Sequence, residues 1–255
     1  QVTSLSFCHV LCSRFPIEMK TCSHDRGTNF FPLYIDLDKT RVNRNSFGEG
    51  LFNAKSHRAS NTSKDFVSDL QEKLGLKFVP NGVGDLSTSF GPADILHYMY
   101  AVFHSPGYRS RYAELLRTDF PHLPLTSSVE FFHALSRFGK DLVALHLMES
   151  PKLDKQITKF VGKELEVEKV TYSNNTVWID KAQTSGFTGV PENVWDFHIG
   201  GYQVCEKWLK DRKGRTLSKE DIEHYHRIVV ALNETIRLMA EIDKVIDAHG
   251  GWPIT

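Results

Sequence analysis

The sequence predicts a mixed α/β chain of the α+β type, in which strands and helices occupy separate stretches. Three observations predict it. Residues 2–37 alternate β-forming side chains, residues 65–150 place apolar side chains at helical spacing, and a capping signal at Ser218 precedes a long amphipathic stretch. The 255 residues, 40% of them hydrophobic and 24% charged, are ordinary for a globular chain with a sizeable core.

Short strands are expected in two places. Residues 2–37 contain three candidates, of which the last is NFFPLYIDL. Within 163–199, the segment KVTYSNNTVWID has β-rich arms around Asn174-Asn175, a dipeptide typical of hairpin turns. We also expect a strand at VWDFHI, ended by Gly200-Gly201.

Helices are expected over most of 65–150. The predicted segments are DFVSDLQEKLGL, capped by Asn61 or Thr62 and ended by Gly75; PADILHYMYAVFHS; PGYRSRYAELLRTDF; and SSVEFFHALSRFGKDLVALHLM, with Gly139 as a possible break. Gly82-Val83-Gly84 lacks the third glycine of a nucleotide-binding fingerprint, so we expect a plain loop before a helix.

The C-terminal part, residues 200–247, carries the clearest pattern. A short helix at GYQVCEKWLKDR is interrupted at Gly214, and Ser218 with Asp221 forms a capping-box-like start for a helix of about 30 residues. Such a helix is roughly 45 Å long. We therefore expect part of its apolar face to pack on something other than a small core, such as a neighbouring module.

Positive charge is concentrated in two segments of an electroneutral chain with 31 basic and 31 acidic residues. Residues 39–64 form a variable basic loop with six basic residues and one acid, and residues 200–219 have six basic residues and two acids. Arg109 and Arg111 form a smaller basic spot. Such segregation lets a neutral chain attract a polyanion, although cations near a helix end also complement its dipole and are often simply solvated.

The candidate DNA-binding residues come from these clusters, and we expect them to converge on one concave surface. Among them, arginines suit base edges and lysines suit phosphates. The set is Arg41, Arg44, Lys55, Arg58, Arg109, Arg111, Lys207, Lys210, Arg212, Lys213 and Arg215.

Motifs for catalysis are missing from the sequence. It contains no phosphate loop, no G-x-S-x-G elbow and no histidine or cysteine spacing of a zinc site. No apolar run is long enough for a membrane span, and the start is unlike a secretory signal. Cys8, Cys12, Cys22 and Cys205 are interpreted as reduced, and Gln1 in place of methionine suggests a piece of a longer polypeptide.

Several blocks, in order, resemble one protein family. They are FFPLYIDL, then ADILHYMYAVFHSPGYRSRYAELLRTDFPHLPL, then FFHALSRFGKDLVALHLME, and last VWDFHIGGYQVCEKWLKDRKGRTLSKEDIEHYHRIVVALNETIRLMAEID. Together they resemble the C-terminal specificity region of type ISP and related single-polypeptide restriction-modification enzymes, from about residue 2 to residue 245. Residues 39–64 and 150–165 do not match closely, so the basic loop gains no support from the family.

The resemblance implies a target recognition module that binds double-stranded DNA in a prokaryotic cytoplasm. The methyltransferase, helicase and nuclease modules would lie upstream, and S-adenosylmethionine, ATP and Mg²⁺ would bind there rather than in this chain. No membrane partner is implied. The alternative is a spacer that couples the methyltransferase to the motor without direct base readout.

Overall fold

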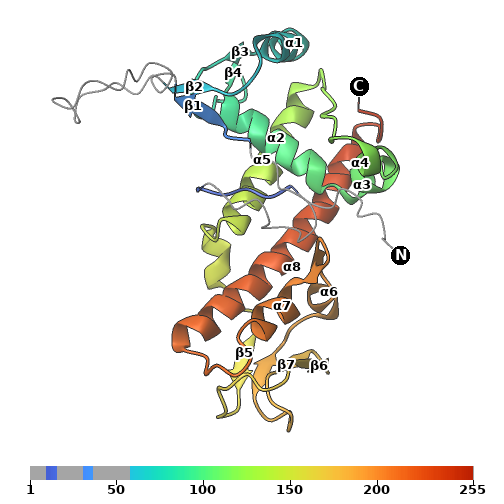
Figure 1. Cartoon of the computed structure of the whole chain (residues 1–255). Coiled ribbons are helices and arrows are strands. Elements are labelled where there is room, and N and C mark those ends of the chain that lie inside the picture. Colours follow the sequence, from blue (N-terminus) through green and yellow to red (C-terminus); the bar gives the residue numbers. More distant parts are fainter. Residues whose placement is uncertain (1–9, 16–30, 37–57, 255) are drawn as a thin grey trace, which may run out of the picture.

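The computed structural model describes residues 10–15, 31–36 and 58–254 (Figure 1). The first two strand candidates fall mainly outside these ranges, as do Arg41, Arg44 and Lys55 of the basic loop. The remaining predictions can be compared with the fold.

The described helices group in the middle and at the end of the chain, as predicted. They are α1 (Lys64–Leu74), α2 (Pro92–His104), α3 (Pro106–Arg111), α4 (Leu115–Thr118), α5 (Val129–His146), the 3₁₀ helix η2 (Pro151–Asp154), α6 (Glu192–Trp195), α7 (Val204–Lys210) and α8 (Lys219–Ala248).

The described strands form small separate sheets. The pairs are β1 (Tyr34–Asp36) with β2 (Arg58–Ser60), antiparallel; β3 (Lys77–Phe78) with β4 (Ser89–Phe90), parallel; and β9 (His198–Ile199) with β10 (Tyr202–Gln203), antiparallel. The fourth sheet has the order β5-β8-β7-β6 and contains β5 (Lys159–Val161), β6 (Thr171–Ser173), β7 (Thr176–Trp178) and β8 (Gly186–Thr188).

One hydrophobic core lies among the helices α2, α3, α5 and the C-terminal half of α8. Tyr98, Phe132 and Leu142 are among its fully buried members. Helices α2 and α5 cross so closely that a Cβ on Gly139 would lie 1.7 Å from the His97 carbonyl oxygen. Gly139 is therefore not a helix break, as the sequence suggested, but the contact point that lets the two helices approach.

A second core lies under the four-stranded sheet, where Val177, Phe187 and Leu209 have no exposed surface. The β6–β7 hairpin is confirmed at the predicted turn: Asn174 and Asn175 have φ of 50° and 55°, the left-handed values that a type I′ turn requires. Segment 165–167 is hydrogen-bonded to 215–217, so the turn before α8 is attached to this part of the molecule.

Helix α8 belongs to both cores. Tyr225 and Val229 pack in the sheet-side core, whereas Leu238, Ile242 and Ile246 pack in the helical core. Its predicted cap is confirmed, since the Ser218 hydroxyl accepts from Asp221 N–H and the Asp221 carboxylate accepts from Ser218 N–H. Packing within the chain accounts for the length of α8, because the two cores together cover its apolar face. No neighbouring module is needed to cover that face.

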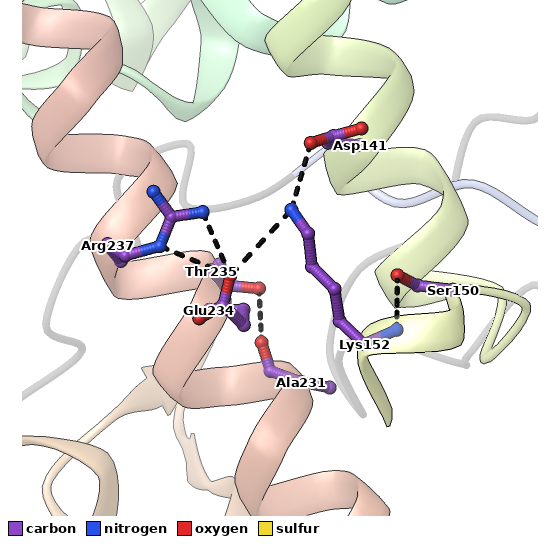
Figure 2. Close-up of polar contacts among 7 residues, drawn as sticks. All are labelled: Asp141, Ser150, Lys152, Ala231, Glu234, Thr235 and Arg237. Carbon is purple, nitrogen blue, oxygen red and sulfur yellow. Dashed lines mark hydrogen bonds and ion pairs between the residues drawn. The ribbon is translucent and has the colours of Figure 1, made fainter. Parts of the chain in front are cut away.

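Polar contacts also join α5, η2 and α8 (Figure 2). Lys152 of η2 donates to the Asp141 carboxylate at 3.0 Å and lies 3.8 Å from the Glu234 carboxylate, which also accepts from Arg237 at 2.9 Å. The turn after α5 is thus fixed to both long helices.

Three further local predictions are wrong. The segment VWDFHI is not one strand: Pro191 precedes α6, whose Val194 is buried, and only His198–Ile199 is a strand. The segment PGYRSRYAELLRTDF forms two short helices, α3 and α4, because α3 ends at Tyr112, whose backbone leaves the helical region. The cap of α1 is Ser63 rather than Asn61 or Thr62.

Candidate nucleic-acid interface

Arg58 is the candidate from the basic loop that the structure describes. It is exposed on β2, and its guanidinium carbon lies 3.6 Å from the centre of the Tyr34 ring on the neighbouring strand. Within the described ranges no hydrogen bond or ion pair engages its nitrogens. Stacking therefore fixes the plane of the guanidinium while leaving its donors available.

Tyr34 is itself attached to the loop that precedes α2. Its hydroxyl oxygen accepts a hydrogen bond from Gly82 N–H at 2.8 Å. The Gly82 carbonyl in turn accepts from Ala93 N–H at 2.9 Å, in the first turn of α2. The predicted loop at 82–84 is confirmed as a loop, and the contact with Tyr34 gives it a role that the sequence did not reveal.

Arg109 and Arg111 differ from each other in the structure. The Arg109 guanidinium turns inward, where its Nε–H donates to the Phe103 carbonyl at 2.7 Å. Arg111 is exposed, with its guanidinium carbon 6.0 Å from the Tyr112 ring centre. Of the two side chains, Arg111 is exposed, whereas Arg109 is only partly so.

The lysines of α7 are paired with acids on the same helix or at its end. Lys207 Nζ lies 2.5 Å from the Asp211 carboxylate and Lys210 Nζ lies 2.9 Å from the Glu206 carboxylate, both at i,i+4 spacing. Such exposed pairs contribute only a few tenths of a kcal/mol. They nevertheless offset the positive charge that the segment would show to a polyanion.

Arg212 joins α7 to α8. Its guanidinium carbon lies 3.4 Å from the Trp208 ring centre, its Nε–H donates to Asp221 at 3.1 Å, and its Nη1–H donates to the Trp208 carbonyl at 3.0 Å. Hydrogen bonding from Ser218 and then from Arg212 holds the pKa of Asp221 below its usual value. Arg212 is therefore engaged in holding the turn between the helices.

Lys213 and Arg215 are exposed, and within the described ranges neither side chain forms an ion pair. Their turn lies against segment 163–169, KELEVEK, which contributes three glutamates and two lysines. Of the second cluster, these two side chains are exposed and have no hydrogen-bond or ion-pair partner in the described part of the chain.

The expected convergence on one surface does not hold for Arg58 and the second cluster. Figure 1 shows the β1–β2 ribbon beside α1, β3 and β4 at one end, and α7 with the β5–β8 sheet toward the other. Helix α8 and the helical core lie between them.

A set of basic side chains that the sequence analysis missed lies on α5. His133, Arg137 and Lys140 are exposed, and their spacing of four and three residues places them on one face of the helix. Among the described residues, none of the three has a hydrogen-bond or ion-pair partner. The spacing of the three residues could have revealed this face from the sequence. A count of net charge along the chain does not, because α5 also contains acidic residues.

Other kinds of site find no support in the part of the chain that the structure describes. That part has no group of three or more acidic, histidine or cysteine side chains suited to a metal ion. The thiols of Cys12 and Cys205 are free there, and burial raises the pKa of Cys205 to about 12. None of its helices is long and apolar enough to cross a membrane.

The sequence model of the Type ISP C-terminal specificity domain matches residues 2–241. The chain belongs to this family. The search of curated proteins returned no match.

Two solved structures share the fold of this specificity domain. One is an ATP-dependent Type ISP restriction-modification enzyme, LlaBIII, bound to DNA, with a TM-score of 0.53, 18% identity and 82% of this chain covered. The other is a DrdV–DNA complex, with a TM-score of 0.56, 20% identity and 75% covered. The chain spans 13% and 21% of the lengths of those two proteins, so it corresponds to one part of each.

Proposed function

We propose that this chain reads a target sequence in double-stranded DNA for a restriction-modification polypeptide. The observation that carries the proposal is the specificity-domain match over residues 2–241. The fold is shared with parts of two proteins whose structures contain DNA, which supports the same ligand here.

The chemistry of modification and cleavage belongs to other modules in this proposal. S-adenosylmethionine, ATP and Mg²⁺ would bind there, and the assembly would act in the prokaryotic cytoplasm. This chain would supply binding energy and sequence choice, and the upstream modules would act on the site it selects.

The division of labour among the cations follows from their surroundings. Arg58, Arg111, Arg137, Lys140, Lys213 and Arg215 are exposed and free of ion pairs among the described residues. Contacts from such side chains to phosphates give affinity and a steep salt dependence, whereas contacts to base edges give selectivity. Lys207, Lys210 and Arg212 would first have to give up Asp211, Glu206 and Asp221.

One observation favours the spacer alternative. The ion pairs of α7 are what a solvated structural surface would show, and the second cluster was one of the two main reasons to expect DNA contact. A spacer would couple modules without a base preference of its own. Selectivity of the chain by itself therefore separates the two functions.

The test is binding of this chain to a fluorescent duplex library, followed by recovery and sequencing of the bound fraction. We expect binding at about 50 mM salt with log K falling linearly as log salt rises, and enrichment of one sequence at moderate salt. Binding without enrichment would favour the spacer, and absence of binding at low salt would overturn the proposal.

A further inference from the structure

We infer that Tyr34 positions Arg58 to contact a single guanine through the major groove, with the loop before α2 as its rigid support. The inference rests on the proposed function and deepens it, because it names one selectivity-determining side chain and the residue that orients it. Guanine is the base whose O6 and N7 acceptors match the fork of an arginine.

The support begins in the buried start of α2. Asp94 is 3% exposed, and its carboxylate accepts from Gly84 N–H at 2.6 Å and from Gly91 N–H at 2.9 Å. A Cβ on Gly84 would lie 2.2 Å from the Ser89 carbonyl oxygen, and one on Gly91 would lie 2.4 Å from that of Gly82. The two sides of the loop are thus in direct backbone contact.

A second carboxylate closes the outer part of the loop. Asp85 accepts from the N–H groups of Ser87, Thr88 and Ser89 and from the Thr88 hydroxyl, at 2.7 to 3.0 Å. These hydrogen bonds hold the pKa of Asp85 well below its usual value. Although the loop is on the surface, it has few ways to move.

Gly82 transmits this rigidity to the ribbon. Its carbonyl is bound by Ala93 N–H, and its own N–H donates to the Tyr34 hydroxyl, so both of its backbone groups are fixed. The Tyr34 ring then lies under the Arg58 guanidinium at 3.6 Å. A continuous set of contacts therefore runs from the core to an exposed planar fork.

The shape of the region suits a groove of DNA. The β1–β2 pair is a two-stranded antiparallel ribbon, and the major groove admits such a ribbon. An arginine held flat on a tyrosine loses less side-chain entropy when it forms two parallel hydrogen bonds. Because Arg212 is stacked as well but has its nitrogens bound to Asp221 and Trp208, the inference applies to Arg58 and not to every stacked arginine.

The experiment compares variants on the same randomised duplex library. Arg58→Lys keeps the charge but loses the fork, so binding at low salt and the salt slope should change little. Preference for guanine at one position should fall about 5- to 150-fold. Arg14→Lys is the matched control, because Arg14 is also exposed but lies outside the candidate set and pairs with Glu149. It should leave every position of the selected sequence unchanged.

Two substitutions at Tyr34 test positioning. Tyr34→Leu removes the ring and should reduce the same guanine preference nearly as much as Arg58→Lys. Tyr34→Phe keeps the ring and removes the hydrogen bond to Gly82, so its loss should be smaller. If Tyr34 only stabilises the fold, Tyr34→Leu should weaken binding to all sequences equally and leave the guanine preference intact. That result would overturn the inference, whether or not the variant has a lower melting temperature.

The outcomes separate this inference from the proposed function. If the wild-type chain enriches a sequence and Arg58→Lys enriches it with unchanged preference at every position, the inference fails and the function stands. If the wild-type chain enriches nothing, the function itself fails, and the inference with it.

Discussion

Two arginines, each stacked on an aromatic ring, occupy opposite ends of the molecule. Arg58 lies 3.6 Å from the Tyr34 ring centre and Arg212 lies 3.4 Å from that of Trp208. Arg58 is exposed, and in the described part of the chain nothing binds its fork, whereas Arg212 gives two hydrogen bonds to Asp221 and Trp208. The same stacking thus leaves one guanidinium exposed and secures the other in a turn.

The comparison extends to the regions around them. The end that carries Arg58 rests on the crossing of α2 and α5, and the end that carries Arg212 rests on the β5–β8 sheet. A count of charges along the sequence favours the Arg58 end and the Arg212 end equally as DNA-binding surfaces. Such a count does not show which basic side chains are already paired with acids. Substitutions at each end should therefore give different results.

The largest effect is expected from a methyl group at the α2–α5 crossing. Gly139→Ala would place Cβ against the His97 carbonyl oxygen, a backbone atom that cannot move without separating the helices. We expect a loss of about 3 kcal/mol or more in the free energy of unfolding. Gly201→Ala, with no atom within 4 Å of its Cβ, is the control at the other end and should cost less than about 0.5 kcal/mol. Equal denaturation midpoints would contradict the comparison.

Acid should weaken the helical end through His146. The Tyr100 hydroxyl is 2.6 Å from its Nδ1 and the Thr235 hydroxyl is 3.0 Å from its Nε2. The Thr235 hydroxyl donates its own hydrogen to the Ala231 carbonyl, so toward His146 it acts as an acceptor. Nε2 of the neutral ring therefore carries the proton. Burial, and then the charge of Arg109, lowers the pKa of His146 to about 4.

The sign of the effect follows from this lowered pKa. The unfolded chain binds the proton first, so stability is unaffected above pH 6.5 and falls as the pH drops from 6.5 to about 4, by about 3 kcal/mol in all. Burial also lowers the pKa of His226 at the sheet end, which adds a second contribution of the same sign. Denaturation midpoints across this range should show a shallower slope for His146→Gln. An unchanged slope would rule out His146 as its source.

Exchanging each stacked arginine for methionine should give opposite results. Arg212→Met loses both hydrogen bonds of the α7–α8 turn and should reduce stability by about 2 kcal/mol. Arg58→Met should change stability by less than about 0.5 kcal/mol and reduce DNA selectivity instead. Melting and library selection on the same two variants measure both. If the two variants lost stability to the same extent, the distinction between the arginines would disappear.

The smallest effects concern binding to phosphates. Replacing Arg137 and Lys140 by glutamine should flatten the dependence of log K on log salt by about one unit for each phosphate that is no longer bound. The same exchange at Lys207 and Lys210 should change the slope less, because each already has an acidic partner. Anisotropy titrations at several salt concentrations give both slopes, and a larger change for the α7 pair would reverse the assignment.

Local signals in the sequence predicted local structure well. Asn174-Asn175 marked the hairpin and Ser218 with Asp221 marked the start of α8, because the turn and the cap each depend on residues a few positions apart. The strand expected at VWDFHI failed because its alternation resembles a strand, while the helical turn after Pro191 is set by burial of Val194. Tertiary burial thus overrode the local pattern.

The candidate site was harder to predict because its contacts are distant in sequence. Tyr34 and Gly82 are 48 residues apart, and no local pattern links them. The Arg212–Asp221 pair joins two helices across a turn, so the charge count included an arginine that is already engaged. Contacts of this kind depend on how the elements pack, which periodicity does not report.

The position of α8 in both cores has a practical consequence for shortened versions of the chain. The family match ends at residue 241, yet Ile242 and Ile246, only 0% and 1% exposed, complete the helical core beyond that point. A polypeptide cut at the family boundary would leave the apolar side chains of α2, α3 and α5 without this cover. The last turns of α8 must be kept if such a fragment is to remain monodisperse.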